Sequence, residues 1–156
     1  MDFSRIVRSL MYHMSKPYRI YRRHKFLSFE KSGKAITCHF STGFDIRLFA
    51  KGQIAECLYM HSYEYDEIEL VINHVKAGMN VIDIGANIGL YSIISDRLVG
   101  VEGHVWAFEP STETHNRLLA NLALNEASSV EPIKIALSDV VDSELTLKRD
   151  PGHMDG

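Results

Sequence analysis

The chain has 156 residues, of which 46% are hydrophobic and 24% are charged. This composition is sufficient for a domain with a buried core and excludes a chain that is disordered throughout. The net charge of −3 combines +6 in residues 1–25, from seven Lys/Arg and one acid, with −9 in the other residues. The acidic body therefore argues against a nucleic-acid partner, and no apolar run is long enough to cross a membrane.

The first 25 residues predict a basic amphipathic helical arm. The positions that share one apolar helix face are Phe3, Ile6, Val7, Leu10, Met11 and Met14. Pro17 ends this pattern, because the residue before a proline is disfavoured in the helical region. We expect the arm to pack on the domain with its cations in solvent. The alternative is a weak contact of residues 1–25 with an anionic membrane surface or with a partner.

Residues 26–60 predict a small β-rich appendage that carries no chemistry. The segments rich in strand-forming residues are 25–30, 35–40 and 44–49. Turn residues separate them at 32–33 and 41–43, so we expect antiparallel strands.

Residues 61–156 predict a Rossmann-like domain in which strands and helices alternate. The expected elements are a helix over 64–78, a strand over 80–84, a helix over 90–100, a strand over 104–108, a helix over 112–125, a strand over 133–137 and a further strand over 144–148. Such alternation indicates βαβαβ units with right-handed crossovers and a parallel sheet. The strand over 80–84 is apolar enough to be buried on both faces.

The turn after this strand, residues 85–89, is the most informative part of the sequence. Gly85 permits a bend that a Cβ would obstruct, and Gly89 lets the next helix start close to whatever lies above the sheet. The turn presents backbone N–H groups at the carboxyl end of a parallel strand, where such sheets bind ligands. An NAD-binding turn needs a second glycine where this chain has Asn87. S-adenosylmethionine, which has no pyrophosphate, makes no such demand.

Two carboxylates extend this candidate site. Asp83 at the strand end can engage the positively charged aminoacyl part of S-adenosylmethionine, whereas it would repel a pyrophosphate. Glu109, at the end of the next strand and outside the core, can accept hydrogen bonds from both ribose hydroxyls of either cofactor. For each acid alone, a capping or ion-pair role is the alternative.

Three segments in the same order resemble motifs of FkbM-type methyltransferases: residues 81–92, 106–110 and 136–139. The resemblance covers about residues 60–155. It implies a doubly wound class I methyltransferase fold, S-adenosyl-L-methionine as methyl donor, and a hydroxyl acceptor on a sugar or related small molecule. The cofactor-binding residues that it implies are Asp83, Gly85, Ala86, Asn87, Gly89, Glu109, Pro110, Ala136 and Leu137. Among them, Glu109 would bind the ribose, and residues 136–137 would lie near the adenine.

Members of that family continue with a further strand beyond the point where this sequence stops. We therefore expect a truncated domain whose first strand has an unpaired edge, and which self-associates or is completed by another copy. The alternative function is a non-catalytic fragment or accessory subunit that retains a nucleoside half-site. An NAD-dependent oxidoreductase is a less favoured third interpretation.

The sequence assigns no catalytic base and no metal cluster. The histidines considered for the base are His39, His61, His74, His104, His115 and His153. Tyr63 and Glu64 are expected to border the methionine end of the pocket. Cys38 and Cys57 fit neither a metal-ligand spacing nor a disulfide framework, so reduced thiols in a cytoplasmic protein are expected.

Overall fold

The computed structural model describes residues 16–40, 42–49, 51–140 and 146. The apolar positions of the expected N-terminal arm lie outside these residues, as does the expected strand over 144–148 apart from Thr146. Within the described ranges, no helix is long and apolar enough to cross a membrane.

The first described element is a helix, α2 (Lys16–Ser32), so the strand predicted over 25–30 is wrong. Pro17 lies in the first helical turn, where its missing N–H breaks no hydrogen bond. Gly33, with φ 65°, follows the last helical residue in the left-handed conformation that ends many helices. The phenylalanines of residues 25–30 favour a strand locally, but only Phe26 is buried, on one face of the helix.

The strands β1 (Ala35–Phe40) and β2 (Phe44–Phe49) form the expected antiparallel hairpin. A short helix that the sequence did not predict, α3 (Gly52–Tyr59), follows it. The rings of Phe26 and Tyr59 lie 5.6 Å apart and join α2 to α3. The buried residues that the hairpin adds to this core are Ile36, Cys38, Phe44, Ile46 and Leu48. Burial raises the pKa of the Cys38 thiol to about 11.

The helix α4 (Tyr65–His74) leads from this core to the parallel sheet and buries Ile68. It ends before the predicted boundary at residue 78, because Val75 is already extended, with φ −73° and ψ 131°.

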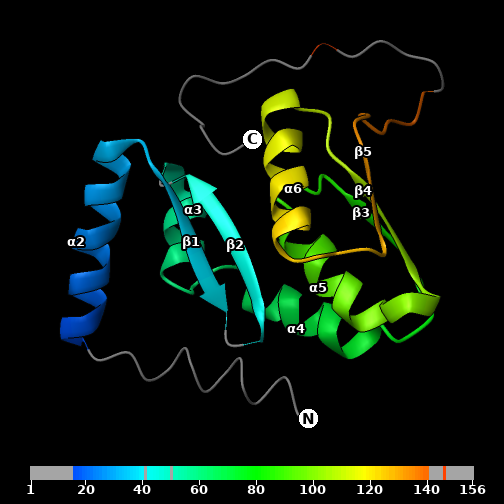
Figure 1. Cartoon of the computed structure of the whole chain (residues 1–156), viewed down its shortest axis with the longest axis horizontal. Coiled ribbons are helices and arrows are strands. Elements are labelled where there is room, and N and C mark those ends of the chain that lie inside the picture. Colours follow the sequence, from blue (N-terminus) through cyan, green and yellow to red (C-terminus); the bar gives the residue numbers. More distant parts are fainter. Residues whose placement is uncertain (1–15, 41, 50, 141–145, 147–156) are drawn as a thin grey trace.

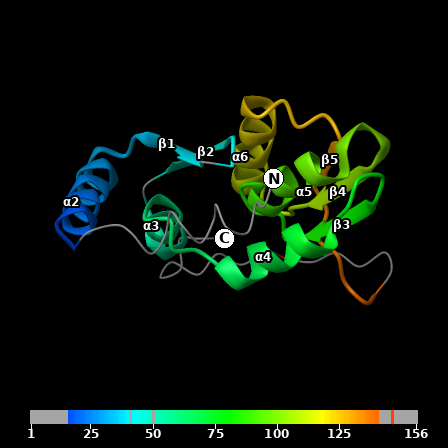
Figure 2. The ribbon, with the colours of Figure 1, turned by 90° about the horizontal axis from the view of Figure 1, so that it is seen from below.

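The parallel strands are β3 (Asn80–Ile84), β4 (His104–Phe108) and β5 (Val130–Ile133), and their order in the sheet is β3-β4-β5. The crossover helices are α5 (Leu90–Val99) and α6 (Thr112–Leu124). The predicted βαβαβ order is therefore confirmed, with β3 at an edge of the described sheet. In both Figure 1 and Figure 2, α6 lies between the hairpin and this sheet.

The last described strand lies earlier than the predicted 133–137. In the register of the sheet Val130 pairs with Val105 and Ile133 with Phe108, where β4 ends. Because β4 offers no partner beyond that point, Ile135 and Leu137 follow the strand and are 55% and 46% exposed.

The sequence predicted that both faces of the strand β3 are buried, and this prediction is wrong. Ile82 and Ile84 point to the same side of the sheet and are 61% and 69% exposed. Both right-handed crossovers advance in the same direction across the sheet, which places α5 and α6 together on the opposite face. Val105 and Ala107 of β4 point to that covered face and are fully buried.

Replacing Phe26 tests its place in the buried core. Phe26→Ala is expected to lower the free energy of unfolding by about 3–5 kcal/mol, because this ring is 1% exposed in the core. Leu27→Ala is the matched control and is expected to cost about 1 kcal/mol or less, because Leu27 is 38% exposed. Denaturant unfolding measures both, and equal losses would contradict the burial of Phe26 relative to Leu27.

Candidate functional site

The turn from Gly85 to Gly89 joins β3 to α5 in an unusual backbone conformation. Gly85, Asn87 and Gly89 all have positive φ, at 76°, 49° and 95°. The backbone N–H groups of Gly85 and Ala86 both donate to the carbonyl of Phe108, at 2.9 Å each. The end of β4 therefore fixes the first half of the turn.

Gly89 allows a close approach between two helices. A Cβ built at this position would lie 2.7 Å from Cδ1 of Leu118 on α6. The missing side chain thus lets α5 begin directly against α6, whereas the sequence suggested only a close approach to something above the sheet.

Glu109 follows β4 directly and joins the turn to α6. Its Oε2 accepts the backbone N–H of Asn87 at 3.0 Å, and its Oε1 accepts that of Ser111 at 2.8 Å. The expectation that Glu109 lies outside the core is wrong, because these two donors hold it in a position where it is 7% exposed. Each carboxylate oxygen keeps a further lone pair, so ribose binding by Glu109 stays a prediction.

Asp83, the last polar residue of β3, is held by the first turn of α5. Its Oδ2 accepts a hydrogen bond from Oγ of Ser92 at 2.6 Å. Burial raises the pKa of Asp83 above its ordinary value of 3.8, the hydrogen bonds from Ser92 oppose this rise, and the charge of Glu109 adds to it. The carboxylate is therefore costly to keep ionised in the described structure.

Glu64 lies beside the same helical turn, although it comes from the segment before α4. The hydroxyl of Tyr91 donates to Oε2 of Glu64 at 2.6 Å. Glu64 has φ 40°, a conformation that non-glycine residues rarely adopt. Burial, and then the Glu64 carboxylate, raise the pKa of Tyr91. Two neighbouring residues of α5, Tyr91 and Ser92, thus each donate to a different carboxylate.

Three carboxylates accept hydrogen bonds from residues 87–92: Asp83, Glu109 and Glu64. In the part of the chain that the structure describes, none of them forms an ion pair with a lysine or arginine. No cluster of metal-ligating side chains occurs among the described residues either. This arrangement favours a cationic ligand and disfavours an anionic one.

The structure does not bring every predicted residue into this arrangement. Ala86 is buried within the turn, and Pro110 lies between Glu109 and the Ser111 cap of α6. Ala136 and Leu137 follow β5 at the same carboxyl end of the sheet, in an irregular segment.

The described histidines make no hydrogen bond that would mark one of them as a base at the turn. Those bonded elsewhere are His39 with Asp45, His74 with the Leu70 carbonyl, and His104 with Glu131. Among the described histidines, none is hydrogen-bonded to the turn or to its carboxylates, and His153 lies outside the described residues. Burial, and then the charge of Arg22, lower the pKa of His61 to about 4, so its ring is neutral at pH 7.

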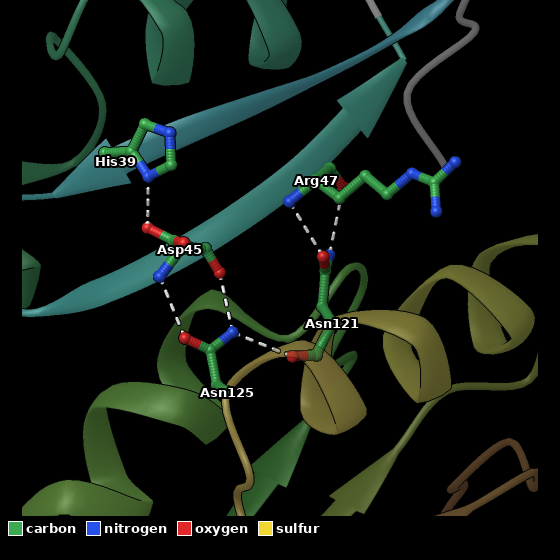
Figure 3. A network of polar contacts seen from close by, with 5 residues as sticks. All are labelled: His39, Asp45, Arg47, Asn121 and Asn125. Atoms are coloured by element: carbon green, nitrogen blue, oxygen red, sulfur yellow. Dashed lines mark hydrogen bonds and ion pairs between the residues drawn. The ribbon is translucent and has the colours of Figure 1, made fainter.

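Two asparagines, Asn121 on α6 and Asn125 at its C-cap, bind the hairpin, and Figure 3 shows these contacts. Asn125 accepts the N–H of Asp45 at 2.8 Å and donates to its carbonyl at 2.6 Å. Asn121 accepts the N–H of Arg47 at 2.8 Å and donates to its carbonyl at 3.1 Å and to that of Ile88 at 2.8 Å. The sequence identified Asn125 only as a helix end and missed Asn121. The sequence pattern that could have identified Asn121 is its position three residues after Leu118, which places a polar residue on the buried face of the helix.

An open groove of about 620 Å³ lies near the hairpin rather than at the turn. Its lining residues are Glu30, Gly33, Arg47, Phe49, Lys51, Glu113, Asn116, Arg117 and Ala120. Because this lining includes none of the residues predicted to bind the cofactor, the candidate site rests on the contacts of the turn and not on the groove.

The family comparison matches most of the described chain. The family model of the Vibrio cholerae RfbT protein matches residues 23–137. The chain belongs to this family. The comparison does not identify the FkbM family, which stays a prediction. No curated protein matches the chain.

Several solved structures resemble the fold of this RfbT-family chain. Trm5b from Pyrococcus abyssi is 23% identical with a TM-score of 0.50, and the match covers 70% of this chain and 30% of that one. A SAM-dependent O-methyltransferase from Thermotoga maritima is 24% identical, with a TM-score of 0.48 and coverage of 72% and 44%. The tRNA m1G37 methyltransferase of M. jannaschii is 20% identical, with a TM-score of 0.49 and coverage of 71% and 32%.

The similarity to Trm5b confirms the predicted Rossmann-like α/β fold. The chain spans less than half the length of each of these three proteins.

The comparisons correct one expectation about partners. The acidic body argued against nucleic acid, but similar structures include a tRNA methyltransferase and a complex of aTrm5 with tRNALeu. The exclusion therefore does not hold, because net charge reports on the whole surface and the same fold occurs in proteins that act on RNA.

Replacing Asp83 tests the electrostatic cost at the turn. Asp83→Asn is expected to raise the free energy of unfolding at pH 7, because the neutral amide removes the cost of ionising a buried carboxyl group. The raised pKa means that the stability of the unsubstituted protein falls as the pH rises through that pKa. The gain from Asn should therefore vanish below pH 3.8, the ordinary Asp value, where both residues are neutral. Denaturant unfolding across this range measures it, and a gain that persists in acid would contradict the assignment.

Proposed function

We propose that this chain binds S-adenosyl-L-methionine and takes part in methyl transfer to a hydroxyl group of a sugar or related small molecule. The observation that carries the proposal is that three carboxylates, Asp83, Glu109 and Glu64, accept hydrogen bonds from residues 87–92 at the start of α5 and have no described counter-cation. The fold supports the cofactor class, and the resemblance of residues 81–92, 106–110 and 136–139 to FkbM-type enzymes supports the acceptor class.

Charge favours this cofactor over a dinucleotide. S-adenosylmethionine carries an ammonium and a sulfonium group, whereas NAD carries two negative charges on its pyrophosphate. A cation next to Asp83 would offset the cost of burying this carboxylate, and a pyrophosphate would increase it. Asn87 also stands where a dinucleotide-binding turn requires a glycine for close contact with the phosphates.

The predicted cofactor-binding residues contact different parts of S-adenosylmethionine. Asp83 engages the ammonium group, directly or through a water molecule. Glu109 accepts the ribose hydroxyls with the lone pairs that Asn87 and Ser111 leave unused. Ala136 and Leu137, beyond β5, border the adenine.

The bound cofactor supplies an electrophilic methyl group on sulfur. The contribution of this chain is to hold that group in a fixed direction, because methyl transfer needs the acceptor oxygen, the carbon and the sulfur in line. The turn is suited to this purpose, since β4 and α6 fix its backbone at both ends.

Cys38 and Cys57 are free thiols, which supports a reducing, cytoplasmic setting.

Ligand binding separates the two cofactor classes directly. Calorimetry with the purified chain should show binding of S-adenosylmethionine and S-adenosylhomocysteine and no binding of NAD. Binding of NAD without a response to either sulfur compound would overturn the proposed function.

The role of Glu109 has its own test. Glu109→Gln should weaken S-adenosylhomocysteine by about 2–4 kcal/mol, using about 1.5–3 kcal/mol for each hydrogen bond to a charged group and allowing for partial replacement by water. Glu113→Gln is the matched control, because Glu113 pairs with Arg117 on the outer side of α6 and should leave affinity unchanged. Equal affinities for the two folded variants would restrict Glu109 to holding the backbone.

A further inference from the structure

We propose that Asn121 is a positioning residue that couples the β1–β2 hairpin to the turn between Gly85 and Gly89. The inference rests on the proposed function, because it assigns to the hairpin a part in organising the cofactor site. No chemistry was expected of the hairpin from its sequence, and the structure connects it to the turn through one buried side chain.

The amide of Asn121 has a fixed orientation. The residue is 0% exposed, and its oxygen accepts from Arg47 N while its nitrogen donates to the carbonyls of Arg47 and Ile88. Because the oxygen and both hydrogens of the amide have partners, a rotation that improved one contact would break another. The side chain therefore holds β2, α6 and the turn in a single arrangement.

The contact with Ile88 acts on the second half of the turn. Ile88 directly precedes Gly89, and Glu109 already holds the N–H of Asn87 on the other side. Asn121 thus provides a hydrogen bond that orients the Ile88 carbonyl, and with it the peptide between Ile88 and Gly89.

Asn125 provides an internal comparison for this role. It makes the same pair of hydrogen bonds to the edge of β2, with Asp45 in place of Arg47. Its third contact, however, is to the carbonyl of Asn121 within α6 and not to the turn. If Asn121 served only to attach the hairpin, loss of either side chain would have the same effect on the turn.

The test compares Asn121→Ala with Asn125→Ala in the full chain, by amide hydrogen exchange and by calorimetry with S-adenosylhomocysteine. Both variants should increase exchange at residues 45–47. Only Asn121→Ala should increase exchange at residues 85–89 and weaken the ligand, by about tenfold, as expected for one hydrogen bond. Asn125→Ala should bind within about twofold of the unsubstituted chain.

A second variant covers the case in which Asn121→Ala does not fold. Asn121→Asp keeps an acceptor for Arg47 N but removes both donors, so it should loosen residues 85–89 while β2 stays attached through that acceptor. Equal exchange at residues 85–89 in the Asn121 and Asn125 variants, or no change there in either Asn121 variant, would overturn the coupling. If the unsubstituted chain binds no S-adenosylhomocysteine, the proposed function fails, while the exchange data still decide the coupling.

Discussion

The two carboxylate oxygens of Glu109 accept backbone N–H groups from two different segments, the turn after β3 and the start of α6. These segments lie at the carboxyl ends of adjacent parallel strands, so one side chain determines how far apart the two helices begin. The short distance between Gly89 and Leu118 depends on this spacing. The position of Ser92 against Asp83 depends on it as well, because α5 starts from the same turn.

Asn121 and Asn125 connect α6 to the hairpin, and they also pair backbone groups on the outer edge of β2. The outward N–H and C=O groups of Asp45 and Arg47 would otherwise be unpaired on β2, and exposed strand edges of this kind promote association with other chains. Two amides, one helical turn apart, match the spacing of alternate residues on the strand, so α6 completes the hairpin as a neighbouring strand would.

The order of the parallel strands and the turn at residues 85–89 were predictable because glycine spacing and apolar periodicity are local signals. The helix α2 was not, since the phenylalanines of residues 25–30 favour a strand locally and the buried face depends on the packing of Phe26 in the core. The burial of Glu109 and the role of Asn121 depend on partners distant in the sequence, and Asn121 lies 74 residues from Arg47. The exposure of Ile82 and Ile84 follows from the direction of both crossovers, which periodicity within one strand does not encode.

The positions of the two thiols allow opening of the hairpin to be followed by cysteine alkylation. Cys38 lies in the core of the hairpin, with a pKa of about 11 and 4% exposure, whereas Cys57 on α3 is half-buried. Because only the thiolate is nucleophilic, the closed hairpin protects Cys38 from alkylation both sterically and by protonation. The rate at which Cys38 is alkylated therefore measures how often the hairpin opens, with Cys57 as a reference in the same molecule.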